Sequence, residues 1–242
     1  MAKRLRILAG PNGSGKTSIY KDLRDEFNWG IFVNADMIEQ TFRTDGELNL
    51  SVYGVCNVSA ELFSGYFNVS TQARQSHCTL DNLDLRDDVL LIKNLNLLDS
   101  YFAAFVASFI QQILIELGVS FSFETVMSHP SKLDVMRLAK QKGYRVYLYY
   151  VSTLSPEINV GRVRTRVAEG GHDVQVAKIS SRYTKSLEQL YEAISLSDRA
   201  YVFDNSGKKY QWIAEYDGAH RELKVYQDLS WFNHFVLDKL GK

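Results

Sequence analysis

The stretch Gly10-Pro11-Asn12-Gly13-Ser14-Gly15-Lys16-Thr17 matches G-x-x-x-x-G-K-[ST], the pattern of a phosphate-binding loop. The apolar run at residues 5–9 predicts a short buried strand before the loop, and residues 17–27 have the pattern of a helix after it. Glycines let backbone N–H groups close around phosphate oxygens, and the start of the helix adds partial positive charge. This order of strand, loop and helix favours a phosphate-binding loop over an ordinary glycine turn.

The loop predicts where a nucleotide and Mg²⁺ bind. Lys16 is expected to reach the β- and γ-phosphates, and the hydroxyl of Thr17 is expected to ligate the metal. The residues predicted to bind the nucleotide are Gly10, Pro11, Asn12, Gly13, Ser14, Gly15, Lys16, Thr17 and Ser18.

The composition is typical of a soluble globular protein. The chain has 242 residues, of which 45% are hydrophobic and 23% are charged. This length allows one large α/β domain, or one domain with a sizeable insertion. Lys+Arg and Asp+Glu number 28 each, so no overall charge points to a nucleic acid or a membrane as partner.

Three features bear on the compartment. The two cysteines, Cys56 and Cys78, lack metal-like spacing and suit a reducing environment as buried apolar residues. The phosphate-binding loop begins at residue 10, which leaves no room for a signal peptide before the first strand. The most apolar stretch, residues 102–117, contains two glutamines and a glutamate, so we expect it to be too short and too polar to span a bilayer. We therefore expect a cytoplasmic protein.

Apolar runs alternate with helical patterns, which predicts an α/β fold with a five-stranded parallel sheet and helices on both faces. In an open parallel sheet the carboxyl ends of the strands face the ligand crevice, so the chemistry is expected there. The strands are expected near residues 5–9, 31–34, 120–124, 145–151 and 200–203.

We expect a single domain over residues 1–242, with two special regions. Residues 44–117 interrupt the alternation and hold no strong strand pattern, so they predict a mainly helical insertion around a buried apolar helix near 95–117. Residues 155–196 predict a helical lid region, which opens at a serine followed by a proline. The tail predicts a hairpin around 210–225 and a closing helix at 231–240.

Asp36 follows the second predicted strand, in Asn34-Ala35-Asp36. In a phosphate-loop kinase the end of that strand faces the γ-phosphate, where a carboxylate can accept the proton of an attacking hydroxyl. The other interpretation is that Asp36 caps the helix predicted over 37–43, and one residue could do both.

Glu124 ends the third predicted strand, and Thr125 follows it. An acid at the end of an apolar strand beside a phosphate-binding loop is typical of a group that organises the metal or holds the substrate. Thr125 would either hydrogen-bond the substrate or begin a turn. Both residues are predicted to contact the substrate.

Arg162, Arg164 and Arg166 fall within one predicted helix, and Arg182 falls within the next. Arg162 and Arg166 share a face because they are four residues apart. The segment Glu169-Gly170-Gly171-His172-Asp173 predicts a glycine hinge between the two helices. Arginines beside such a hinge can close over a nucleotide as a lid and stabilise the transferring phosphoryl group. The alternative interpretation is a solvated basic face.

Two further segments keep two interpretations each. His172, within the glycine hinge, would either contact phosphate or serve as a cap of the hinge. The loop Asp204-Asn205-Ser206-Gly207 follows the fifth predicted strand. In folds of this kind such a loop lies beside the nucleotide base, but the same residues also suit a plain Asn-Ser-Gly turn.

Taken together, these elements resemble the zeta-toxin family. The resemblance rests on the loop with its preceding Leu8-Ala9, on Asn34-Ala35-Asp36, on Phe123-Glu124-Thr125 and on the Arg-Val-x-x-Gly-Gly-His-Asp stretch at 166–173. The segments 182–187 and 204–206 fit the branch of the family that is often described only as ATPases. In all, the resemblance covers roughly residues 1–43 and 118–207.

The resemblance implies the fold of nucleoside monophosphate kinases, with strand order 2-3-1-4-5. It also implies ATP- and Mg²⁺-dependent phosphorylation of a UDP-activated amino sugar, typically at the 3′-hydroxyl of UDP-N-acetylglucosamine. Because the family includes toxin–antitoxin systems, an antitoxin protein is a further candidate partner. The implied roles are phosphate and metal binding for Lys16 and Thr17, general base for Asp36, binding of the sugar nucleotide for Glu124, and stabilisation of the phosphoryl group for Arg162 and Arg166, with Arg182 as the competing second arginine.

Two features depart from the family pattern. The segment 44–117 is longer and more helical than expected, and it borders the position where the acceptor should bind. Gln175 stands where this branch usually has proline. The acceptor therefore stays open at this point.

Two other functions also stay open. One is a kinase of another acceptor, such as a nucleoside, an antibiotic alcohol or a polynucleotide 5′-hydroxyl, of which the last should give a steep salt dependence. The other is a nucleotide-gated binding module, in which the segment 44–117 docks a partner chain through an exposed apolar patch.

Overall fold

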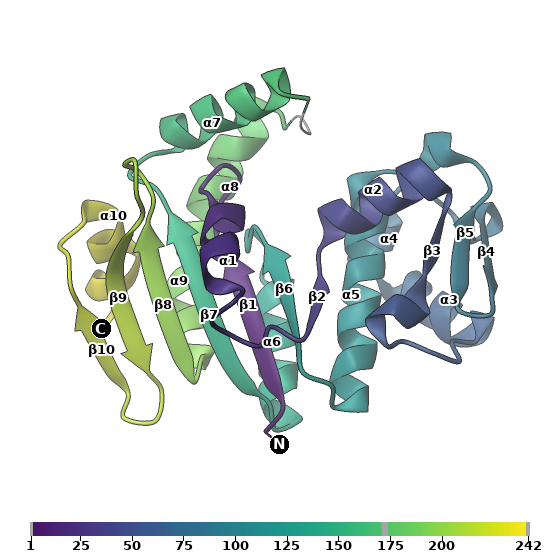
Figure 1. Ribbon diagram of the computed structural model, residues 1–242, viewed down its shortest axis with the longest axis horizontal. Coiled ribbons are helices and arrows are strands. Elements are labelled where there is room, and N and C mark those ends of the chain that lie inside the picture. The colour runs from purple at the N-terminus through teal and green to yellow at the C-terminus, as the bar shows by residue number, and fades with distance from the viewer. Residues whose placement is uncertain (1, 171–173, 241–242) are drawn as a thin grey trace. The chain divides into compact units, whose positions relative to one another are not determined.

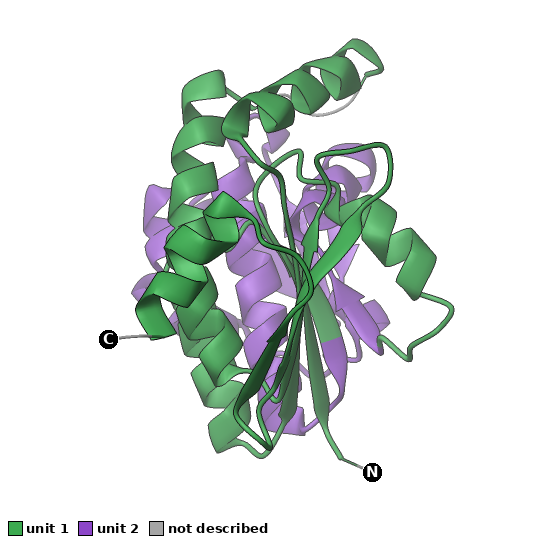
Figure 2. Ribbon diagram, turned by 90° about the vertical axis from the view of Figure 1, so that its left-hand side faces the viewer, with its two compact units in different colours: residues 1–29, 122–242 green, residues 30–121 purple. Residues whose placement is uncertain are grey.

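Residues 2–170 and 174–240 are described by the structure, which is a computed structural model. The chain divides into two units, shown in different colours in Figure 2. Unit 1 comprises Met1–Trp29 and Ser122–Lys242, and unit 2 comprises Gly30–Phe121. Unit 2 is wider than the insertion expected at 44–117, because it also includes the second strand and the helix that follows it. The single domain with an insertion stays a prediction.

Unit 1 is built on a mostly parallel sheet with the strand order β10-β9-β8-β7-β1-β6. β1 pairs in parallel with β7, and β7 pairs in parallel with β8, whereas β9 and β10 form an antiparallel hairpin on the edge. This is the 3-1-4-5 part of the expected order, and the hairpin extends the sheet beyond the parallel strands that the sequence predicted. The strands are β1 (Arg4–Ala9), β6 (Phe121–Thr125), β7 (Arg145–Ser152), β8 (Arg199–Asp204), β9 (Gln211–Asp217) and β10 (Glu222–Val225).

Helices cover both faces of this sheet, as expected. Helix α1 (Lys16–Leu23) lies on one face, and α6 (Ser131–Gln141), α8 (Val176–Glu188) and α9 (Leu190–Leu196) lie on the other (Figures 1 and 2). The single helix expected over 174–196 is in fact two helices, which meet at Gln189. Helix α7 (Pro156–Ala168) lies beyond the carboxyl ends of the strands (Figure 1).

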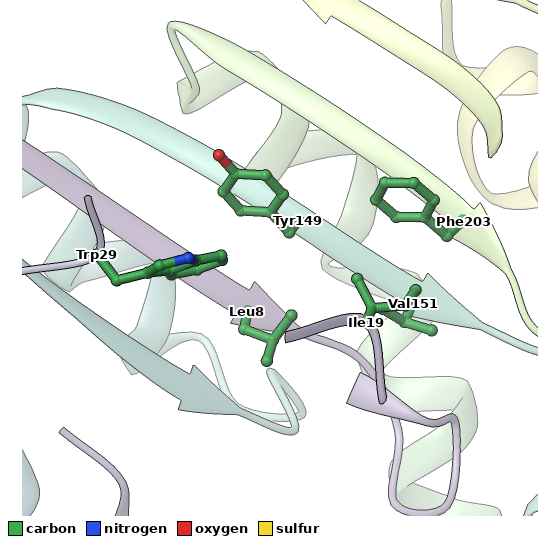
Figure 3. Close-up of a cluster of buried hydrophobic side chains, with 6 residues drawn as sticks. All are labelled: Leu8, Ile19, Trp29, Tyr149, Val151 and Phe203. Atoms are coloured by element: carbon green, nitrogen blue, oxygen red, sulfur yellow. The ribbon is translucent and has the colours of Figure 1, made fainter. Parts of the chain in front are cut away.

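A cluster of buried side chains joins α1 to the sheet. Figure 3 shows its members, which come from β1, α1, the segment after α1, β7 and β8. The rings of Trp29 and Tyr149 lie 5.0 Å apart, and the indole N–H of Trp29 donates to the Leu23 carbonyl at 3.3 Å. This packing fixes the helix whose first turn follows the phosphate-binding loop. The cluster consists of Leu8, Ile19, Trp29, Tyr149, Val151 and Phe203.

The tail has the elements that the sequence predicted. The hairpin β9–β10 is followed by α10 (Ser230–Phe232), a π-helical segment (Asn233–Leu237) and α11 (Asp238–Leu240), which run on without a break. The indole N–H of Trp231 donates to Asp204 at 3.1 Å in a buried position. This hydrogen bond ties the closing helix to the end of β8.

Unit 2 contains β2 (Ile31–Val33) and the helices α2 (Ala35–Asp45), α3 (Ala60–Val69), α4 (Thr71–Gln75) and α5 (Ser100–Leu117). It also contains a small antiparallel sheet with the order β3-β5-β4, which the sequence did not predict. Its strands are only three or four residues long, too short for an alternating pattern to stand out. They are β3 (Glu47–Asn49), β4 (Leu83–Arg86) and β5 (Val89–Ile92).

Helix α5 is the core helix of unit 2. It begins after Asp99, whose carboxylate accepts the N–H groups of Tyr101 and Phe102, and it ends at Gly118 in the left-handed conformation. By length and composition alone its 18 residues could cross a membrane, so the expectation of a stretch too short and too polar was wrong. Just over half of that stretch, 56%, is buried within the structure, as in the core helix of a soluble protein.

We predict that Phe105→Ala destabilises unit 2 by about 3–5 kcal/mol. The Phe105 ring is buried and lies 5.4 Å from the ring of Phe63 and 5.2 Å from that of Phe67, so its removal leaves a cavity. Urea denaturation measures the free energy of unfolding. Val52→Ala is the control, because this side chain is 70% exposed and should change stability by less than about 0.5 kcal/mol. Equal effects of the two substitutions would contradict this description of the core.

Candidate active site

The phosphate-binding loop joins the end of β1 to the start of α1, as the sequence predicted. Gly13 and Gly15 have φ of +76° and +93°, a region that side chains with a Cβ rarely adopt. The loop also leaves no room for side chains at these places. A Cβ on Gly13 would lie 2.6 Å from the carbonyl oxygen of Asn159, and one on Gly15 would lie 2.0 Å from Nδ2 of Asn205.

Lys16 is buried at the base of the loop, with 6% of its surface exposed. Its ammonium group donates to the carbonyl oxygens of Gly10 at 2.8 Å and Pro11 at 3.0 Å, and Nζ lies 3.7 Å from Oε1 of Glu124. A buried ammonium needs such partners, because an unpaired charge away from water is costly. The structure therefore brings together two of the residues that the sequence predicted for the site, Lys16 and Glu124.

Thr17 and Ser18 lie in the first turn of α1 and are exposed. The N–H groups of a first helical turn have no helical partner and point along the axis, where they suit an anion. In the part of the chain that the structure describes, no group of three or more His, Cys, Asp or Glu side chains is placed to hold a metal ion.

Several buried polar atoms around the loop have no hydrogen-bond partner. They are Oδ1 of Asn12, Oγ of Ser14, Nδ2 of Asn159 and Nη1 of Arg162. Buried polar groups are nearly always paired, so a cluster of unpaired ones indicates a place where a polar ligand binds. The residues present here fit a nucleoside triphosphate.

Thr125 begins a turn of its own chain. Its hydroxyl oxygen accepts the N–H of Met127 at 3.0 Å, and its carbonyl accepts the N–H of Gly10 at 3.2 Å. Of the two interpretations of Thr125, the structure shows the turn. Contact with the substrate stays a prediction.

The arginines lie on the helices of the predicted lid region. Arg162, Arg164 and Arg166 are on α7, and only Arg162 is half-buried, with Nη2 at 3.5 Å from the carbonyl oxygen of Gly207. Arg182 is half-buried on α8. A solvated basic face thus describes Arg164 but not Arg162. Gly171, His172 and Asp173 of the expected hinge lie outside the described residues.

Tyr183 links α8 to the residue that follows β7. Its hydroxyl donates to the carbonyl oxygen of Thr153 at 2.6 Å. Burial raises the pKa of Tyr183 to about 12, so the hydroxyl stays protonated at neutral pH and remains a donor. The Ser186 hydroxyl in turn donates to the carbonyl oxygen of Val126 at 2.7 Å, which links α8 to the loop after β6.

The loop after β8 is more than a plain turn, because it reaches the phosphate-binding loop. The Asn205 amide donates to the Ser14 carbonyl at 2.8 Å, while Asp204 accepts the N–H of Ser206 at 2.9 Å. Between this loop, α1 and α7 lies a cavity of about 600 Å³, within the range of roughly 300–1,000 Å³ for ligand pockets. It is lined by Gly15, Ser18, Asp22, Arg162, Asn205, Gly207, Lys208, Lys209 and Tyr210.

Five residues of this site were missed by the sequence analysis. Asp22 lies four residues after Ser18, on the same face of α1, and this spacing could have indicated it. Lys208, Lys209 and Tyr210 continue the loop that was singled out only as far as residue 207. Asn159 is fully buried on α7 one turn before Arg162, and a polar residue at an apolar position is its only signal.

Asp36 belongs to unit 2, and its local structure removes one of its two interpretations. The cap of α2 is Asn34, whose side chain accepts the N–H groups of Asp36 at 2.8 Å and Met37 at 3.1 Å. The expectation that Asp36 caps the helix was therefore wrong. Its carboxylate lies exposed in the first turn, and the assignment as general base stays a prediction.

The family model described as "Zeta toxin" matches residues 96–218 of this chain, which is half of its length. The chain belongs to the zeta-toxin family. The match contains Glu124, all four arginines and the loop after β8, but neither the phosphate-binding loop nor Asp36. This zeta-toxin family member is also 33% identical over 69 residues to an uncharacterized protein of Haemophilus influenzae, over 28% of this chain and 49% of that relative. The matched segment thus spans about half the length of the curated relative.

Solved structures share the fold of this family member. One is the native AvrRxo1-ORF1:ORF2 complex, with a TM-score of 0.57 and 16% identity over 93% of this chain and 61% of that one. Another is from the PezAT chromosomal toxin–antitoxin system of Streptococcus pneumoniae, with a TM-score of 0.51 and 16% identity over 97% of this chain and 79% of that one. The AvrRxo1 complex has also been solved with ATP, with a TM-score of 0.56 and 16% identity over 93% of this chain and 60% of that one. These matches show an α/β fold of the phosphate-loop kinase type.

We predict that Gly13→Ala lowers the affinity for MgATP at least about 10-fold, measured by titration calorimetry, because the backbone of Asn159 blocks the new Cβ and the loop must move. Gly143→Ala is a matched control. Gly143 has φ of +79° and no atom within 4 Å of an added Cβ. The Gly143→Ala variant should lose about 1 kcal/mol of stability and keep its affinity for MgATP. Equal affinities of the two variants would show that the close approach does not shape the site.

Proposed function

We propose that this protein is an ATP- and Mg²⁺-dependent phosphotransferase that acts on a hydroxyl of a UDP-activated amino sugar such as UDP-N-acetylglucosamine. The observation that carries the proposal is Lys16, buried in the loop and 3.7 Å from Glu124, beside a cavity of nucleoside size. Membership of the zeta-toxin family supports the same reaction. A cytoplasmic location is part of the proposal.

When bound, ATP with Mg²⁺ supplies the γ-phosphoryl group that is transferred. Lys16 leaves the carbonyl oxygens of Gly10 and Pro11 and turns its ammonium group to the β- and γ-phosphates. The Thr17 hydroxyl would hold the metal. Glu124 remains as the carboxylate nearest to Lys16 and holds the sugar nucleotide or the metal shell.

Arg162 lines the cavity, where it is proposed to bind the nucleotide. Its Nη1 is buried without a partner, so this edge of the guanidinium is available to a phosphate or ribose oxygen. Arg166 lies four residues on and shares its face of α7, so the two arginines act together as a lid. Arg182 on α8 is the alternative second arginine.

Asp36 is proposed as the general base. It follows β2 in the first turn of α2, and the Asn34 side chain caps the helix in its place. The Asp36 carboxylate is thereby left to accept a proton from the acceptor hydroxyl as the bond to phosphorus forms. An antitoxin protein is proposed as a partner, in line with the toxin–antitoxin system named for one structural neighbour.

Lys16→Ala should lower kcat/KM for phosphoryl transfer about 100- to 1,000-fold or more, because the charge on the phosphates is no longer matched. The measurement is transfer of label from γ-labelled ATP to UDP-N-acetylglucosamine. Lys21→Ala is the control, since Lys21 is exposed on the same helix and does not line the cavity. A Lys16→Ala enzyme with normal turnover would refute the site.

Asp36→Asn should leave MgATP affinity unchanged and lower kcat about 100- to 10,000-fold, the usual contribution of a general base. Single-turnover kinetics with labelled ATP separates the chemical step from binding. Asp45→Asn, an exposed aspartate at the other end of α2, should behave as the unmodified protein. If both variants turn over normally, the base is another group.

The acceptor can be identified by incubating the protein with γ-labelled ATP and a pool of cell metabolites. A labelled UDP-sugar is the expected product. A labelled nucleoside or oligonucleotide would mean that this compound, and not a UDP-sugar, is the acceptor. An oligonucleotide acceptor would make the rate strongly salt-dependent. Release of free phosphate alone, with partner affinity that changes with nucleotide, would instead favour a gated binding module.

A further inference from the structure

The cavity beside the phosphate-binding loop continues along α1 to Asp22. Gly15, Ser18 and Asp22 line it from the same side of the helix. Asp22 lies seven residues after Gly15, which is roughly 10 Å along a helix axis. A ligand whose phosphates bind at the loop therefore extends its other end towards Asp22.

Tyr210 also lines the cavity, and its hydroxyl is near enough to Asp22 for the carboxylate to shift its pKa. Its ring packs edge to face on Phe203, with the ring centres 5.6 Å apart, and Phe203 is part of the buried cluster on α1. Burial, the charge of Asp22 and a hydrogen bond to Asp22 raise the pKa of Tyr210. The Tyr210 hydroxyl thus stays protonated at neutral pH and is a donor on the same cavity as Asp22.

The other charged groups of this cavity are positive. Lys208 and Lys209 line it and are exposed, and Arg162 lines it with one buried unpaired nitrogen. These groups suit the phosphates and ribose hydroxyls of a nucleotide. Among the described residues that line the cavity, Asp22 has the only carboxylate, so it is the only side chain of this lining that accepts hydrogen bonds without donating any.

A carboxylate distinguishes bases by the groups on their edges. Adenine presents an amino group at position 6, which donates to a carboxylate, whereas hypoxanthine and guanine present a carbonyl oxygen there, which a carboxylate repels. We propose that Asp22 selects ATP by accepting a hydrogen bond from the 6-amino group of its base. The proposal rests on nucleotide binding at the loop, which is part of the proposed function.

The test compares binding of ATP, ITP, GTP and purine riboside triphosphate, each with Mg²⁺, by titration calorimetry. ITP carries an oxygen in place of the 6-amino group, and purine riboside triphosphate carries only hydrogen. The unmodified protein should bind ATP about 10-fold more tightly than either, a factor typical of a hydrogen bond to a charged group.

Asp22→Asn should remove the preference for ATP over ITP, because the amide of asparagine can donate to the carbonyl oxygen at position 6. The affinity ratio of ATP to ITP should fall about 10-fold or more, while purine riboside triphosphate changes little. Tyr210→Phe keeps the ring on Phe203 and removes only the hydroxyl, so it should lower the ratio less. Asp25→Asn is the control, because Asp25 is an exposed aspartate beyond the end of α1 that does not line the cavity.

Two results would overturn the assignment while leaving the proposed function in place. Equal loss of affinity for all four nucleotides in Asp22→Asn would mean that the carboxylate does not read the base. A preference of the unmodified protein for GTP, lost in Asp22→Asn, would mean that Asp22 faces positions 1 and 2 of guanine. If the unmodified protein binds none of the four, the proposed function itself fails and this assignment with it.

Discussion

The site depends on how closely the backbone of the phosphate-binding loop approaches two other parts of unit 1. Gly13 touches the main chain of Asn159 in α7, and Gly15 touches the side chain of Asn205 after β8. These contacts are possible only without a Cβ. The hydrogen bond from Asn205 to the Ser14 carbonyl adds a polar link at the second place. The glycines therefore serve two purposes: they give the loop its shape, and they let α7 and the loop after β8 form walls of the cavity beside it.

The same close packing sets the electrostatics of the site. Lys16 is buried, so its charge must be matched from within, and the carbonyl oxygens of Gly10 and Pro11 and the carboxylate of Glu124 do so. A phosphate group can replace the two neutral carbonyl oxygens with negatively charged acceptors. Nη1 of Arg162, in contrast, has no hydrogen-bond partner within the described part of the protein. Without a ligand, therefore, the Lys16 ammonium group has partners within this part of the protein, whereas Nη1 of Arg162 has none there.

Sequence patterns predicted the features that are local and missed those that depend on distant parts of the chain. The loop, the strand before it and the proline at the start of α7 all follow from neighbouring residues. Asn34 and Asp36 are both good caps two residues apart, so the sequence could not choose between them, and the structure chose Asn34. The strands of unit 2 are too short to show a period. Asp22 and Tyr210 line the same cavity but are far apart in the chain, and no local pattern marks this.

The assignment to a nucleotide-dependent transferase rests on two observations that do not overlap. The family match begins at residue 96, so it owes nothing to the glycine loop at residues 10–17. That loop, conversely, is recognised from its own residues and is shared by many families. In unit 1 the two sets of residues meet, because Glu124, within the matched segment, lies beside Lys16, and Asn205, also within it, bonds Ser14. Two independent patterns that meet at the phosphate-binding loop are stronger support for a common function than either pattern alone.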